Sequence, residues 1–299
     1  MAEIGRLLTA MVTPFNDSGG VDYDAAQQLA LALLRSGSDG VIIAGTTGEV
    51  PTLSHDEKMG LFKAVKKAVG DAGVVIAGTG NYNTAESEKL GREAEDAGVD
   101  GLLLTVPYYN KPTQEGLFRH FETLAKGTGL PCIMYNIPGR TGVNMTAETT
   151  ARLSRIPNIV GVKEASGNLE QIGQIMNLSR DGFRVWSGND SDTLPILSIG
   201  GFGVICVVSH LVGLQMREII EEYLFGKVDA AATIHRRLLP LMMVLMTAAS
   251  NPIPIKYVLR QLGCKVGGLR LPLVEPDEAT GAKIMDEVRR HRIDLTVPA

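Results

Sequence analysis

Lys163 ends an apolar run, residues 159–163, that has the pattern of a buried strand. Burial disfavours the charged form of an amine, which lowers its pKa and frees the neutral amine to attack a carbonyl. The same position also suits a structural lysine that reaches solvent or pairs with Glu164 or Asp190. Position alone gives these two interpretations equal weight.

Hydroxyl groups stand at the ends of other apolar runs and could handle protons near such an amine. Tyr135 closes the run 132–136, while Thr46 and Tyr109 follow two earlier runs. Forming an imine requires a proton donor and acceptor, and a phenol with an ordinary pKa near 10 needs a relay or a polarising partner. Taken singly, Tyr135 suits packing and Thr46 an ordinary turn. Together they indicate a proton-handling set.

Two further turns could each bind a carboxylate. The turn 45–48 reads GTTG, in which backbone N–H groups and the Thr47 hydroxyl could hold a small acid. Arg140 lies in an expected loop, residues 138–142, and offers a planar fork suited to a second carboxylate. The alternatives are an ordinary strand-to-helix turn and a surface arginine. The combination favours an α-keto acid joined to another acidic carbonyl compound.

Eight short apolar runs, each followed by a segment with helical spacing, would position these groups. They are residues 8–12, 40–44, 74–78, 101–105, 132–136, 159–163, 184–187 and 204–208. Runs without alternation are typical of parallel strands buried on both faces. The sequence therefore predicts a (β/α)8 TIM barrel of class α/β, whose active site lies at the carboxyl ends of the strands. A doubly wound open sheet is disfavoured, because Gly78 and Gly80 lack the third glycine of a nucleotide-binding loop.

The organisation along the chain divides at about residue 226. We expect the catalytic barrel to occupy residues 1–226 and a helical segment to occupy 227–299, with loops at 251–254 and 263–272. The methionine-rich stretch 238–246 favours core packing of a helix over a subunit contact.

Composition excludes several classes of protein. The 299 residues are 44% hydrophobic and 21% charged with a net charge of −4, which is typical of a globular chain with a large core. No basic stripe indicates nucleic acid, no apolar stretch is long enough to span a membrane, and the first residues lack a targeting pattern. Cys132, Cys206 and Cys264 are widely separated among apolar residues. We therefore expect reduced thiols and a cytoplasmic location.

A set of motifs resembles the pyruvate-dependent class I aldolase family over residues 5–273. The motifs are GTTGE, TVPYYNKPTQEG, YNIPGRTG, VGVKEASGN, SGND, GFGVI and NPIPIK. The resemblance implies a TIM barrel in which Lys163 forms a Schiff base with pyruvate. Tyr135 would donate and accept the proton, and Thr46 and Tyr109 would complete its relay. Tyr109 would reach the site of a neighbouring subunit across a tight dimer interface.

The resemblance also implies substrates and assembly. Thr47 and Ile205 would hold pyruvate, and Arg140 would hold the carboxylate of aspartate-4-semialdehyde. Arg140 and the NPIPIK motif favour the branch that joins these two compounds in lysine and diaminopimelate biosynthesis. Members are homotetramers built as dimers of dimers. No metal or organic cofactor is expected, because the lysine itself supplies the electron sink.

Feedback inhibition by lysine is expected to be weak or absent. His55, Glu86 and Tyr108 match the lysine site of inhibited relatives, but Lys58 replaces a histidine or glutamate. A cation there disfavours a cationic ligand. Further departures at the same site are Val50, Pro51 and Tyr82.

Two alternatives remain at this point. One is a sibling lyase that forms pyruvate from N-acetylneuraminate or from a keto-deoxy sugar acid. The other is a non-catalytic paralogue that serves as a regulator or scaffold, which predicts loss of Lys163 or Tyr135, yet both are present.

Overall fold

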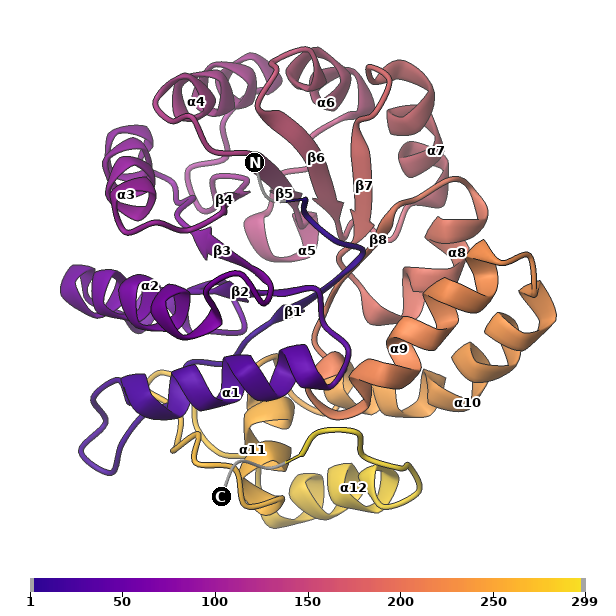
Figure 1. Ribbon diagram of the computed structural model, residues 1–299. Coiled ribbons are helices and arrows are strands. Elements are labelled where there is room, and N and C mark those ends of the chain that lie inside the picture. The colour runs from indigo at the N-terminus through magenta and orange to yellow at the C-terminus, as the bar shows by residue number, and fades with distance from the viewer. Residues whose placement is uncertain (1–2, 297–299) are drawn as a thin grey trace.

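The computed structural model describes residues 3–296 and shows a closed barrel of eight parallel strands ringed by helices (Figure 1). Each strand pairs with its neighbours in sequence, and β1 pairs with β8 to close the barrel. This confirms the predicted TIM barrel, with a strand at each of the eight predicted runs, although β1 and β8 each end two residues earlier than predicted. The strands are β1 (Leu7–Ala10), β2 (Gly40–Ile43), β3 (Val74–Gly78), β4 (Gly101–Thr105), β5 (Cys132–Asn136), β6 (Ile159–Glu164), β7 (Arg184–Ser187) and β8 (Gly203–Cys206).

Most of the ring helices begin at a side-chain cap and end near a glycine or a basic residue. In α2, for example, Ser54 and Glu57 form a reciprocal capping box. The ring consists of α1 (Tyr23–Arg35), α2 (His55–Val69), α3 (Thr84–Asp96), α4 (Gln114–Lys126), α6 (Ala147–Ser154), α7 (Leu169–Leu178), α8 (Thr193–Ser198) and α9 (Ser209–Leu224). Single turns form η1 (Val50–Thr52), α5 (Pro138–Thr141) and η2 (Asp190–Asp192). Residues 138–141 are thus helical where we expected a loop, because Pro138 suits the first turn of a helix.

Two apolar clusters explain why the strands read as continuous apolar runs. One fills the barrel interior and includes Leu8, Ile42, Ile133 and Trp186. The other lies between the outer wall of the barrel and the helices. Since successive strand residues point to opposite faces, most apolar strand residues are buried in one cluster or the other.

The register of β5, β6 and β7 places the key lysine in the barrel interior. Lys163 pairs with Tyr135 on one side and with Trp186 on the other. Gly161 lies two residues earlier on the same face, where a Cβ would stand 2.5 Å from the Trp186 ring. The missing side chain makes room for Trp186 beneath Lys163.

Three more helices follow the barrel, α10 (Val228–Thr247), α11 (Ile253–Gln261) and α12 (Glu278–Val288). They lie outside the ring at the bottom of Figure 1 and share its outer apolar cluster through residues such as Leu238 and Val258. Helix α11 begins within the loop expected at 251–254, because Pro254 at its second position suits a first turn. The proposed division at residue 226 stays a prediction, and its end at 297–299 lies outside the described residues.

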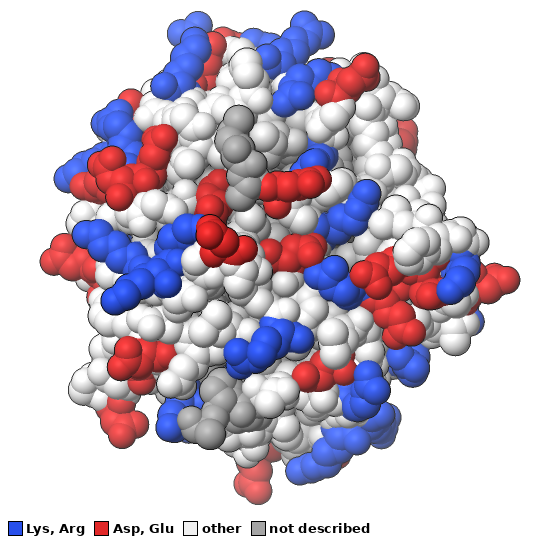
Figure 2. Space-filling model, in the orientation of Figure 1, with Lys and Arg blue, Asp and Glu red and all other residues white. Residues whose placement is uncertain are grey.

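The distribution of charged side chains and of thiols follows the expectations from composition. Figure 2 shows basic and acidic side chains interspersed over the visible face. Among residues 3–296, no helix is both long and apolar enough to cross a membrane. Cys132, Cys206 and Cys264 are buried free thiols.

Candidate active site

Lys163 lies in the barrel interior at the carboxyl end of β6. Its side chain is buried, and Nζ lies 4.2 Å from the centroid of the Tyr135 ring. Burial lowers the pKa of Lys163 to about 8, although the negative charge of Asp190 opposes that shift. A lysine with this pKa keeps a substantial neutral fraction near neutrality, as a carbonyl-attacking amine requires.

Tyr135 stands beside that amine on the neighbouring strand. Burial raises the pKa of the Tyr135 phenol well above 10, and the charge of Arg140 and a hydrogen bond with Thr46 act against the rise. The phenol therefore stays protonated at neutral pH and can donate to a substrate oxygen. Its hydrogen bond with Thr46 places these two hydroxyl groups next to each other, and their role in a proton relay stays a prediction.

The two acidic neighbours of Lys163 behave differently. Glu164 points to the outer face of the strand, where it accepts hydrogen bonds from Asn136 Nδ2 and from the backbone N–H of Ser166. Asp190 is buried and accepts from the backbone N–H groups of Val207 and Val208. Asp190 thus supports the end of β8 and supplies a negative charge near Lys163, but no hydrogen bond joins the two side chains in the described structure.

Arg140 and Thr47 are linked by a residue from the C-terminal segment. Arg140 Nη2 donates to the backbone oxygen of Asn251 over 3.2 Å, and Asn251 Nδ2 donates to Thr47 Oγ1 over 3.0 Å. Arg140 is exposed at the mouth of the site, whereas Thr47 and Asn251 are buried. Sequence reasoning missed Asn251 as a site residue, although the NPIPIK motif contains it.

A small cavity joins these groups above Lys163. Its volume is about 30 Å³, which holds roughly two water molecules before any side chain moves. It is lined by Ala10, Ile42, Gly45, Thr46, Thr47, Leu103, Tyr135, Ile137, Arg140, Lys163, Gly188, Asn189, Val207, Met246 and Asn251. Ile205 packs in the barrel interior instead, and Val207 is the β8-side residue that reaches the cavity wall. The predicted role of Ile205 stays a prediction.

Tyr109 is not brought to the cavity by this chain. Its side chain is 91% exposed, and its backbone has a φ of +73°, which is rare for a bulky residue. The side chain is therefore exposed to solvent and does not line the cavity above Lys163.

A second pocket of about 290 Å³ lies beside α2 and α3. Lys58, Tyr82, Glu86 and Tyr108 are among its lining residues, and the two tyrosine rings contact edge to face. Burial lowers the pKa of Lys58, while Glu86 acts in the opposite sense. His55 pairs with Glu93 over 3.5 Å and does not line this pocket.

The cavity brings together three groups that are suited to carbonyl chemistry. Across residues 3–296, no group of three or more His, Cys, Asp or Glu side chains is arranged to hold a metal ion. An amine of lowered pKa, a protonated phenol and an arginine fork meet around one cavity. This set can form an imine, move its protons and hold a carboxylate at the entrance.

Comparisons with known proteins agree with this geometry. The model of the dihydrodipicolinate synthetase family matches residues 3–291. A relative from Dehalococcoides mccartyi named 4-hydroxy-tetrahydrodipicolinate synthase is 58% identical over 99% of this chain and 100% of its own, and one of that name from Heliobacterium modesticaldum is 52% identical over 98% of both chains. A solved structure, the enzyme of that family from Cyanidioschyzon merolae with lysine bound, superposes with a TM-score of 0.94 at 44% identity, covering 96% of this chain and 98% of that one.

Proposed function

The chain belongs to the dihydrodipicolinate synthetase family, and we propose that it is a lyase that condenses pyruvate with L-aspartate-4-semialdehyde to give 4-hydroxy-tetrahydrodipicolinate. This reaction is the first committed step of lysine and diaminopimelate biosynthesis. The observation that carries the proposal is the buried Lys163 amine beside the Tyr135 phenol, in a cavity whose entrance holds Arg140.

The first half of the reaction uses the cavity floor. The neutral Lys163 amine attacks the ketone carbon of pyruvate. The oxygen takes one proton from the attacking nitrogen and one from the Tyr135 phenol and leaves as water, which gives the iminium. Thr47 and its neighbouring backbone N–H groups hold the pyruvate carboxylate. Loss of a methyl proton then gives the enamine, and the protons pass between Tyr135 and Thr46.

The second half uses the entrance. Arg140 binds the carboxylate of the semialdehyde and presents its aldehyde carbon to the enamine carbon. As that carbon–carbon bond forms, the aldehyde oxygen takes a proton from Tyr135 and becomes the 4-hydroxyl group. The amino group of the second substrate then attacks the iminium carbon and passes a proton to the Lys163 nitrogen, which leaves as the neutral amine. Ring closure therefore releases the product and restores the enzyme.

Substrate turnover tests this function against its same-fold alternative. The purified chain should consume pyruvate and the semialdehyde together, and it should not release pyruvate from N-acetylneuraminate or a keto-deoxy sugar acid. The reverse pattern would assign it to the sibling lyases.

Replacing Arg140 with alanine should impair the second substrate selectively. The KM for the semialdehyde should rise by roughly 10²-fold, because a charge-assisted carboxylate contact of about 2–3 kcal/mol is lost. Borohydride trapping of pyruvate on Lys163 should continue at close to the wild-type rate. Equal damage to both steps would contradict the role assigned to Arg140.

We further propose that the active enzyme is a homotetramer arranged as a dimer of dimers. The exposure of Tyr109 supports this arrangement, because its hydroxyl can join the relay of Thr46 and Tyr135 only in another subunit. Tyr109→Phe should lower kcat by about tenfold while sedimentation still reports the wild-type assembly. A fully active monomer would contradict this proposal.

Inhibition by lysine should be weak or absent. The pocket beside α2 carries the Lys58 ammonium next to Glu86, so a bound lysine would meet a like charge. Lys58→His should raise the sensitivity to lysine by at least about tenfold. An imidazole that is largely neutral at neutral pH would then face the bound lysine in place of a second cation. The measurement is initial velocity against lysine concentration, and a micromolar to low millimolar inhibition constant for the wild type would refute the prediction.

We also propose that the enzyme works in the cytoplasm. The three buried, unpaired thiols support a reducing compartment.

A further inference from the structure

Glu49 closes the GTTGE turn that carries Thr46 and Thr47. It adopts a left-handed backbone conformation, with φ at +55°, which costs free energy for a residue with a side chain. Its backbone N–H donates to the oxygen of Thr46 over 3.1 Å, so the strained residue closes the loop around both threonines. Such a conformation persists only where surrounding contacts fix it.

The Glu49 carboxylate is held by two groups from the C-terminal segment. Lys256 Nζ lies 2.6 Å from Oε1, and the backbone N–H of Arg270 donates to Oε2 over 3.0 Å. Both side chains of the Glu49–Lys256 pair are fully buried, and Nζ also lies 3.8 Å from the centroid of the Phe15 ring. The two ends of this ion pair are 207 residues apart in sequence.

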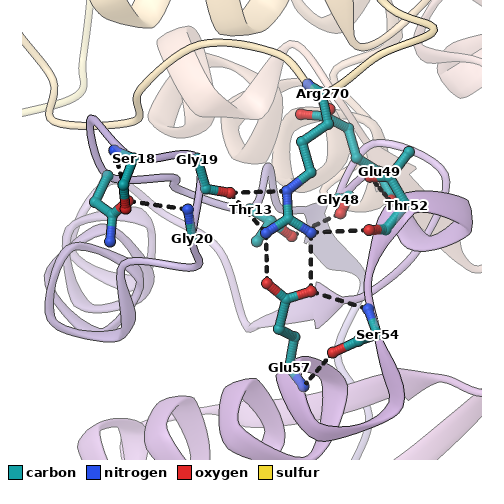
Figure 3. Close-up of polar contacts among 11 residues, drawn as sticks. Thr13, Ser18, Gly19, Gly20, Gly48, Glu49, Thr52, Ser54, Glu57 and Arg270 are labelled. Atoms are coloured by element: carbon teal, nitrogen blue, oxygen red, sulfur yellow. Dashed lines mark hydrogen bonds and ion pairs between the residues drawn. The ribbon is translucent and has the colours of Figure 1, made fainter.

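Arg270 in turn fixes the segment that supplies this contact. Figure 3 shows its guanidinium between the backbone oxygens of Gly19 and Thr52 and the carboxylate of Glu57. Glu57 is itself part of the capping box at the start of α2. The backbone that binds Glu49 is therefore anchored to the loops around the barrel mouth.

Three consecutive residues in the turn are each held by a residue that is distant in sequence. Asn251 donates to the Thr47 hydroxyl, Thr13 Oγ1 donates to the Gly48 oxygen over 2.6 Å, and Lys256 pairs with Glu49. Two of these three contacts come from residues 251–256. The C-terminal segment thus contacts the turn at Thr47, which lines the cavity, and at Glu49, which does not.

Buried ion pairs are a poor source of net stability, because desolvation offsets their attraction. A fully buried pair on a strained residue next to the site therefore requires another explanation. We propose that Glu49 is a positioning residue, held by Lys256 and the Arg270 backbone, that sets where Thr46 and Thr47 stand relative to Lys163 and Tyr135. This inference rests on the proposed function, in which those threonines serve the proton relay and pyruvate.

The test separates positioning from stability with three variants of the full-length enzyme. Glu49→Gln and Lys256→Met each leave one partner buried without its counter-charge, so both should lower Tm. The double variant removes both charges and should recover much of that Tm. We expect kcat/KM for pyruvate, and the rate of borohydride trapping at low pyruvate, to fall at least tenfold in all folded variants, the double variant included.

Lys66→Met provides the matched control. Lys66 pairs with Asp100 over 2.9 Å in a partly buried contact near the amino ends of β3 and β4. That variant should lower Tm while kcat and KM stay at wild-type values. If the double variant regains wild-type kcat/KM along with its Tm, or if folded Glu49→Gln stays within twofold of wild type, the pair is merely structural and the inference fails. Pyruvate trapping on Lys163 is measured without the semialdehyde. The trapping result therefore tests the role of Glu49 independently of which second substrate the enzyme uses.

Discussion

Replacing Lys163 with methionine should lower kcat by at least about 10⁴-fold, or roughly 5.5 kcal/mol in the activation barrier. Methionine preserves the length and apolar stem of the side chain, so the barrel interior stays filled, but the nucleophilic amine is gone. Borohydride reduction in the presence of pyruvate should then yield no adduct by mass spectrometry. The wild type should carry one adduct, on Lys163.

The trapping rate should also follow the protonation of this amine. Because burial lowers the pKa of Lys163 to about 8, the neutral fraction at pH 7 is about 300-fold larger than for an amine of ordinary pKa. The trapping rate should rise with pH through the neutral range, because the neutral amine is the nucleophile and its fraction grows as the ammonium loses its proton. The rate should level off above about pH 8, where most of the amine is already neutral. A rate that keeps rising past pH 10 would show an unperturbed lysine.

Lys256 offers an internal control within the same chain. Burial lowers its pKa to about 8 as well, yet its Nζ lies against the Glu49 carboxylate in a fully enclosed position. A lowered pKa alone therefore predicts that Lys256 also reacts with pyruvate, whereas geometry predicts reaction at Lys163 and not at Lys256. An adduct on Lys256, or an unmodified Lys163, would contradict the proposed mechanism.

The eight strands could be predicted because burial on both faces forces a continuous apolar run at each of them. Their carboxyl ends were less accurate. The sequence predicts strands to residues 12 and 208, whereas β1 ends at Ala10 and β8 at Cys206. The backbone N–H groups of Val207 and Val208 donate to the Asp190 carboxylate instead of to a neighbouring strand. Asp190 lies 17 and 18 residues before them in the sequence, and an apolar pattern carries no information about such a contact.

The site residues also differ in how far the sequence could predict them. Lys163, Tyr135 and Thr46 could be found because each lies at or just after the carboxyl end of a strand, and parallel strands bring these ends together. Asn251 and Lys256 could not be placed that way, since they follow the barrel and reach the GTTGE turn from more than 200 residues away. Tyr109 could not be placed from one chain for a different reason. Its proposed role is in the site of another subunit, which a single chain does not contain.

Replacing Tyr135 with phenylalanine should lower kcat by roughly 10²–10⁴-fold, the usual contribution of a positioned acid or base. The ring that contacts Lys163 remains, so only the hydroxyl and its hydrogen bond with Thr46 are lost. Steady-state turnover and the rate of pyruvate trapping should both fall, yet trapping should still reach one adduct per chain. That outcome separates proton transfer from nucleophilic attack.

Tyr257→Phe is the matched control for this change. Tyr257 is a partly buried residue of α11 whose hydroxyl packs near Gly281, on α12. Losing that hydroxyl should leave kcat unchanged. Because burial raises the pKa of Tyr135, its phenol is a donor throughout the neutral range, so the wild-type profile should show no alkaline loss from this group below about pH 10. If Tyr135→Phe kept wild-type kcat, protons would have to reach the carbinolamine by another path, and Thr46 would lose its assigned partner.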